Sequence, residues 1–150
     1  MSERNPIRLY AVHGWHRDED YARLFEYIES AENFFYKVIS DPGATTPGAD
    51  GSAARRSHIV DSLKDVECVV CPAGTWERFN EWARFTVERA KERDLPVVAL
   101  EHFGPRNMDL RLKGHADEIV GWDSRSIVDA IRRQARHEDT ARFDTIEFEP

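Results

Sequence analysis

Residues whose side chains could bind or react with a ligand gather in three short segments of the sequence. The segments are HGWHRDED (13–20), PAGTWERF (72–79) and EHFGP (101–105), and each follows or ends a short apolar run. Their usable side chains are those of His13, Trp15, His16, Asp18, Thr75, Trp76, Glu77, Glu101 and His102. Imidazoles, indoles and carboxylates together suit a flat polar ligand such as a nucleotide, because stacking and charge-assisted hydrogen bonds can act on it at once.

The histidines and tryptophans of these segments each have a structural interpretation beside the functional one. His13 and His16 are either ligand-facing groups or exposed loop residues. Trp15 and Trp76 either stack on a ligand or cover the ends of the hydrophobic core. Gly14 lies between two of these residues and is counted with them as a candidate binding residue.

The acidic residues of these segments also have both a structural and a functional interpretation. Asp18 is expected to begin a helix, because aspartate is a preferred N-cap residue, rather than to act as a catalytic acid. Glu101 closes the apolar run PVVAL, so the strand itself places this carboxylate at the carboxyl edge of a sheet. There it could serve in catalysis or pair with an arginine.

Alternating strands and helices are predicted to hold the three segments in place. Apolar runs predict strands within 7–14, 34–40, 67–74 and 96–104, and a short strand around Ile119 and Val120. Apolar residues at helical spacing follow several of these strands. They predict a first helix with Tyr21, Leu24, Phe25 and Ile28 on one side, a second around 59–63 and a third that begins near Trp76. A last helix includes 127–131 and begins at a cap, either Asp123 or Ser124.

This alternation predicts a single α/β domain over residues 1–136, followed by an acidic tail over 137–150. We expect a flavodoxin-like three-layer sandwich whose five parallel strands have the order 2-1-3-4-5. Ligands of such sheets bind where the strand order reverses, here between the first and third strands, where the three segments would meet. The longest loop is DPGATTPGADGS (41–52), and the tail either frays or docks on a sheet edge or a partner.

Composition and charge restrict the class of protein. A chain of 150 residues can bury roughly 70% of its unfolded surface without disulfides or a metal. The net charge of −7 opposes binding to nucleic acid or an anionic membrane. With no signal-peptide core or membrane-length apolar run, the expected location is the cytoplasm. Cys68 and Cys71 form one CVVC in an apolar run, and we expect two buried thiols on opposite faces of a strand rather than a redox or metal site.

Three common active-site signatures are missing from the sequence. It contains no GxGxxG, no GxxxxGK[ST] and no GxSxG. Hydride transfer on a Rossmann scaffold, P-loop hydrolysis of ATP and serine-hydrolase chemistry therefore lack their usual signals. A receiver domain of the same strand order is also disfavoured, because the third strand ends in CPAG without a phosphorylatable aspartate.

The chain resembles the TIR-like domains of bacteria, particularly the type found in Thoeris antiphage defence. The likeness covers about residues 7–136 and is carried by LYAVHGWHRDEDYARLFEYIE (9–29), ECVVCPAGTWERFNEWARFTVERAKERDLPVVAL (67–100) and ADEIVGWDSRSIVDAIRR (116–133). The resemblance implies a flavodoxin-like TIR fold in which the loop 41–52 corresponds to the variable loop that mediates TIR assembly. It also implies a nucleotide site that includes Trp82.

Active members of this family cleave NAD at the nicotinamide bond and release or cyclise ADP-ribose. Their catalytic glutamate stands four residues after a tryptophan on the third helix, and here the tryptophan is Trp82 and the fourth residue on is Thr86. Breaking the glycosidic bond needs an anion beside the ribose, so an active protein would have to take its carboxylate from Glu101 or Glu77. From the helix alone, Thr86 is a small packing residue whose hydroxyl bonds to a carbonyl one turn earlier.

Two functions follow from the resemblance. The first is a signalling enzyme of antiviral defence that processes NAD or a related nucleotide, with NAD as substrate or ligand rather than as a tightly bound cofactor. The second is a catalytically silent module that binds a nucleotide or assembles with other copies, with TIR-like subunits or with an effector protein. Thr86 favours the second function, because a threonine cannot supply the missing anion.

Overall fold

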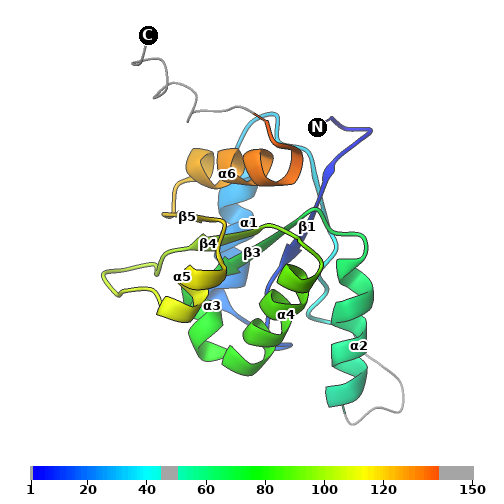
Figure 1. The fold of residues 1–150 in the computed structure, drawn as a ribbon. Helices are drawn as coiled ribbons and strands as arrows, with labels where there is room; N and C mark the ends of the chain where they lie inside the picture. The colour runs from blue at the N-terminus through cyan, green and yellow to red at the C-terminus, as the bar shows by residue number, and fades with distance from the viewer. Residues whose placement is uncertain (1, 45–50, 139–150) are drawn as a thin grey trace.

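Five parallel strands form one sheet in the order β2-β1-β3-β4-β5, as the computed structural model of the chain shows (Figure 1). The structure describes residues 2–44 and 51–138. The strands are β1 (Ile7–Ala11), β2 (Tyr36–Val38), β3 (Cys68–Pro72), β4 (Val97–Leu100) and β5 (Glu118–Val120). The predicted flavodoxin-like sandwich and its strand order are therefore confirmed.

Helices cover both faces of the sheet (Figure 1). They are α1 (Glu19–Glu29), α2 (Ser52–Leu63), α3 (Ala73–Arg78), α4 (Asn80–Glu92), α5 (Leu110–His115) and α6 (Ser124–Arg136). The apolar sides of α1 and α6 pack with one face, and those of α2, α3, α4 and α5 pack with the other. Two separate hydrophobic cores result, as expected for parallel strands that are covered on both sides.

The two cysteines follow the alternation of β3. Cys68 lies in the core beneath α1 and α6, whereas Cys71 lies in the core beneath α2 and α4. Both are free and buried, and burial raises the pKa of each thiol. The prediction of two buried thiols that point to opposite faces is confirmed.

Asp18 caps α1, as the sequence predicted. Its backbone is extended and its carboxylate accepts a hydrogen bond from the backbone N–H of Asp20 at 3.2 Å. The cap of α6 is Asp123 rather than Ser124, because the Asp123 carboxylate accepts from the N–H of Ser126 at 2.9 Å. Each aspartate satisfies a backbone donor that the first helical turn leaves free.

Three features of the fold differ from the sequence prediction. The single helix expected to begin near Trp76 is two helices, α3 and α4, which meet at Phe79 with φ −123° and ψ 49°. The second strand is shorter than 34–40, since only Tyr36–Val38 pair with β1. The short helix α5 was not predicted, because its six residues bury only Leu112 and carry too few apolar positions for a periodic signal.

Two of the predicted segments lie partly outside the described residues. These are the loop 41–52, at residues 45–50, and the acidic tail 137–150, from residue 139 onward. At the start of that loop, Asp41 accepts a hydrogen bond from the N–H of Gly43 at 3.1 Å. Among the helices that the structure describes, none has the length and apolar character needed to cross a membrane.

Candidate functional site

The carboxyl ends of β1 and β3 bring together five of the predicted site residues, His13, Trp15, Asp18, Thr75 and Trp76. The segments 13–20 and 72–79 thus meet at the point where the strand order reverses, whereas Glu101 of the third segment lies toward β5. All five side chains are buried, and Thr75 and Trp76 have no exposed surface. At the reversal point, these five side chains therefore belong to the interior of the fold.

An ionic network fills much of this space. The Asp18 carboxylate accepts hydrogen bonds from the Thr75 hydroxyl and from the Arg78 guanidinium, each at 2.5 Å. Arg78 also donates to Asp20 at 2.7 Å, and Arg23 donates to the other oxygen of Asp20 at 2.5 Å. We call Asp18, Asp20, Arg23, Thr75 and Arg78 the ionic network. Its carboxylates are neutralised within the fold, which is the arrangement of a structural site.

Asp20, Arg23 and Arg78 were not named from the sequence as candidate site residues. The pair Asp20 and Arg23 has the i,i+3 spacing of a helix ion pair, which was the available signal. The contact of Arg78 with α1 depends on Gly74, because a Cβ at that glycine would lie 2.0 Å from a carboxylate oxygen of Asp20. Only the tertiary fold reveals this close approach.

Glu77 is held by the loop that follows β4. His102 contacts one oxygen of Glu77 through Nε2 at 2.9 Å, and Arg106 donates to the other oxygen at 2.5 Å. His102 is buried beside this pair. Glu77 and His102, both named from the sequence, therefore fix the loop after β4 on α3.

Glu101 stands at the carboxyl edge of β4, as predicted, and its side chain is exposed. One of its carboxylate oxygens would lie 3.7 Å from a Cβ added at Gly121, in the loop after β5. Its backbone carbonyl accepts a hydrogen bond from the indole N–H of Trp122 at 2.7 Å. The contacts of Glu101 are thus with the β5 side of the sheet, away from β1.

His13 is a neutral buried histidine. Its Nδ1 accepts a hydrogen bond from the backbone N–H of Trp15 at 3.3 Å, so the ring proton lies on Nε2, which donates to the Tyr10 hydroxyl at 3.2 Å. Burial, aided by the nearby His58, lowers the pKa of His13 to about 4. His13 therefore acts as a fixed polar support beneath the loop after β1 rather than as an exposed loop residue.

Gly14 and His16 surround Phe79, the residue between α3 and α4. A Cβ at Gly14 would lie 2.1 Å from Cγ of Phe79, so this position must be a glycine for the ring to pack there. The exposed imidazole of His16 stacks on the same ring, with 6.1 Å between centroids and 20° between planes. Both residues thus position the turn that starts α4.

Trp15 lies at the centre of a second group of side chains. Its backbone is left-handed, with φ 68°, and its ring is 8% exposed. The Trp82 ring lies 6.1 Å and the His58 ring 5.7 Å from it, and the guanidinium of Arg55 lies over it at 5.2 Å. We call Trp15, Arg55, His58 and Trp82 the aromatic corner. Arg55 and His58 come from α2 and were not named from the sequence.

Polar groups of the aromatic corner are left without partners. The buried Nε1 of Trp15 and the buried Nε2 of His58 make no hydrogen bond to any residue that the structure describes. Arg55 forms no ion pair with a carboxylate of residues 2–44 or 51–138. Buried polar atoms without partners are rare in native proteins, so this corner has a capacity for hydrogen bonding that the described residues do not use.

Thr86 is fully buried in α4, one turn after Trp82. Its hydroxyl donates to the backbone carbonyl of Trp82 at 2.8 Å. The prediction of a packing threonine bonded one turn back is confirmed. The side chain faces the core formed with Ala83, Val87 and Ala90, and it presents no charge to the aromatic corner.

No group of three or more His, Cys, Asp or Glu side chains in residues 2–44 and 51–138 is arranged to hold a metal ion. At the carboxyl ends of β1, β3 and β4, the polar side chains described above belong to the ionic network, the pair Glu77 and His102, and the aromatic corner. In comparisons with known proteins, no protein-family model and no curated protein sequence matches this chain.

Proposed function

We propose that this protein is a TIR-like signalling module that binds a nucleotide at the aromatic corner without cleaving it. The observation that carries the proposal is Thr86. This residue stands where the resemblance places the catalytic glutamate, and its hydroxyl is buried and bonded to the carbonyl of Trp82. The position therefore offers a ligand neither charge nor a free hydrogen-bonding group.

The neighbouring carboxylates are poor replacements for the missing glutamate. Asp18 is bonded to Thr75 and Arg78, and Glu77 is bonded to His102 and Arg106. A carboxylate that is neutralised by an arginine stabilises a developing positive charge less well than a free one. Glu101 is exposed, but its contacts are on the β5 side of the sheet.

Binding of a nucleotide is supported by the groups that the aromatic corner leaves unused. Trp82 is half-buried, so part of its indole is open to stacking. Arg55 supplies a cation that no described carboxylate neutralises, and arginine suits phosphate because its donors form a planar fork. A ring system and a phosphate together are the recognition elements of a nucleotide.

The test is a pair of measurements on the purified full chain. Nicotinamide release from NAD is followed at high protein concentration, alone and with crowding agents, and no turnover is expected. Binding of NAD, ADP-ribose and AMP is measured by calorimetry, and Trp82→Leu and Arg55→Met should weaken it about tenfold or more. Arg93→Met, at the exposed residue that follows the last turn of α4, serves as the control, and equal affinity in all three variants would exclude the aromatic corner.

An NAD-cleaving enzyme is the second candidate, and one observation favours it. The carboxylate of Asp41 lies close enough to His13 to raise the pKa of this imidazole, against the larger effect of burial. An acid at the start of the loop 41–52 could thus serve a ribose bound near Trp15. Turnover of NAD that disappears in Asp41→Asn and persists in Glu101→Gln would establish this function in place of the silent one.

A further inference from the structure

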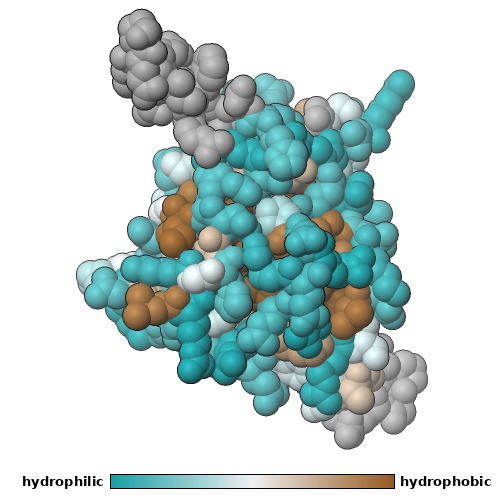
Figure 2. All heavy atoms as spheres, viewed as in Figure 1, coloured by the Kyte–Doolittle hydropathy of each residue, from teal (hydrophilic) through white to brown (hydrophobic). Residues whose placement is uncertain are grey.

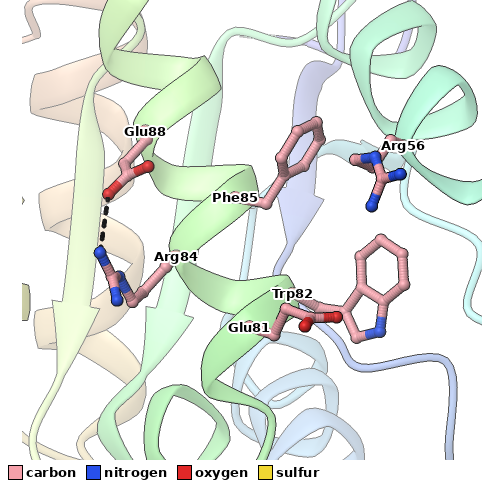
Figure 3. A pocket seen from close by; sticks show the side chains of 6 residues that line it. All are labelled: Arg56, Glu81, Trp82, Arg84, Phe85 and Glu88. Atoms are coloured by element: carbon pink, nitrogen blue, oxygen red, sulfur yellow. Dashed lines mark ion pairs between the residues drawn. The ribbon is translucent and has the colours of Figure 1, made fainter. Parts of the chain in front are cut away.

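A pocket of about 230 Å³ lies between α2 and α4, beside the aromatic corner. Its lining residues are Arg56, Glu81, Trp82, Arg84, Phe85 and Glu88. Trp82 and Phe85 point from α4 toward Arg56 of α2, and Glu81 lies next to Trp82 (Figure 3). A hydrophobic patch is visible between the two helices on an otherwise largely hydrophilic face (Figure 2).

Two of the charged residues of this pocket form an ion pair, and the other two do not form one with any described residue. Arg84 and Glu88 pair with each other at 3.7 Å and lie on the other side of α4 from Arg56 (Figure 3). Arg56 and Glu81 form no ion pair within the described ranges, and Arg56 is exposed. In a chain with a net charge of −7, an exposed arginine without a carboxylate partner beside two aromatic rings is a site for an anion.

The size of the pocket restricts the ligand to a single ring system. Pockets for drug-sized molecules occupy roughly 300–1,000 Å³, and this one is smaller. A whole dinucleotide cannot be enclosed, whereas one base can lie against Trp82 and Phe85. The carboxylate of Glu81 can accept hydrogen bonds from an exocyclic amine, and Arg56 can donate to a phosphate.

We propose that the pocket between α2 and α4 binds a nucleoside monophosphate whose base carries an exocyclic amine. The base lies against Trp82 and Phe85, its amine faces Glu81, and the phosphate lies at Arg56. This inference rests on the proposed function, because Trp82 belongs to both the pocket and the aromatic corner. The ligand then lies in the groove between two helices rather than at the reversal point of the sheet, where the sequence predicted it.

The experiment is calorimetric titration of the full chain with AMP as the probe, beside inosine monophosphate, adenosine and inorganic phosphate. AMP should bind, and adenosine and inorganic phosphate should each bind at least about tenfold more weakly, since each lacks one half of the recognition. Inosine monophosphate, which has no exocyclic amine, should also bind more weakly than AMP. This preference should disappear in Glu81→Ala.

Substitutions of the arginines on the two sides of α4 test where the ligand binds. Arg56→Gln should weaken AMP binding about tenfold, whereas Arg84→Gln, the matched control on the same pocket, should change it less than about twofold. Both positions are at the surface, so thermal unfolding of each variant should match that of the parent chain. Equal affinity of Arg56→Gln and the parent chain would overturn this inference.

The same titrations separate this inference from the proposed function. If AMP or NAD binds and Arg55→Met weakens it while Arg56→Gln and Phe85→Leu do not, the ligand lies at Trp15, and only the inference about the pocket fails. If none of the nucleotides binds to the parent chain, both proposals fail.

Discussion

The ionic network and the aromatic corner share the loop between β1 and α1, which contributes Asp18 to the first and Trp15 to the second, and the fold uses their charges in opposite ways. At the ionic network, Arg78 joins two buried carboxylates from α1, Asp18 and Asp20. At the aromatic corner, Arg55 lies over an indole and pairs with no described carboxylate. A network whose groups satisfy one another holds the structure together, whereas one with unused donors is available to a ligand.

Among the variants that test this difference between the ionic network and the aromatic corner, Thr86→Glu should have the largest effect on stability. It places a carboxylate where the resemblance expects one. Because Thr86 is fully buried among apolar side chains of α4, the charge should lower the free energy of unfolding by about 4 kcal/mol. Denaturant unfolding measures the change, with Thr86→Val as the control, which should lose less than about 1 kcal/mol. A Thr86→Glu variant as stable as the parent chain would mean that this position is open to the aromatic corner.

Arg78→Met should give the next largest effect. Removing the guanidinium leaves Asp18 and Asp20 buried and close together with less compensation, and we expect a loss of about 3 kcal/mol in the free energy of unfolding. The control is Arg84→Met, whose pair with Glu88 is partly exposed at 3.7 Å and should contribute less than about 0.5 kcal/mol. Equal losses in the two variants would remove the distinction between buried network and surface pair.

His13 contacts Trp15 of the aromatic corner, and the titration of its imidazole gives a pH dependence of known sign. Its pKa is lowered to about 4 in the folded chain, so between pH 6.5 and 4 the unfolded chain binds a proton that the folded chain does not. Stability should therefore fall as the pH drops, by about 2 kcal/mol at pH 5 relative to pH 7.5. Denaturant unfolding at the two pH values should show that this loss of stability is absent in His13→Gln. The loss should be retained in His16→Gln, the control at an exposed residue.

Arg55→Met should have the smallest effect on stability, below about 0.5 kcal/mol, because the guanidinium leaves no carboxylate of residues 2–44 and 51–138 unpaired. The same substitution is expected to weaken nucleotide binding, so Arg55→Met and Arg78→Met should separate stability from affinity. A large loss of stability in Arg55→Met, measured by denaturant unfolding, would show that the aromatic corner is structural too.

Patterns local to the sequence predicted the strands and the cap at Asp18, because hydrophobic periodicity and capping act over a few residues. The strand order followed from the topology that five alternating strands and helices favour. The same patterns predicted the alternation of Cys68 and Cys71 between two cores. The break between α3 and α4 was not predictable in this way. It depends on Phe79 packing against Gly14, a residue that lies far away in the sequence.

What the sequence by itself determined is the absence of an acid at Thr86, together with the set of groups at the reversal point of the sheet. Whether those groups are free or engaged was decided only by the tertiary structure, because that depends on arginines of other elements. Arg78 and Arg106 engage Asp18 and Glu77, whereas α2 brings Arg55 and Arg56 beside the indoles without a described carboxylate partner. Burial and pairing are properties of contacts between distant segments, and no local pattern records them.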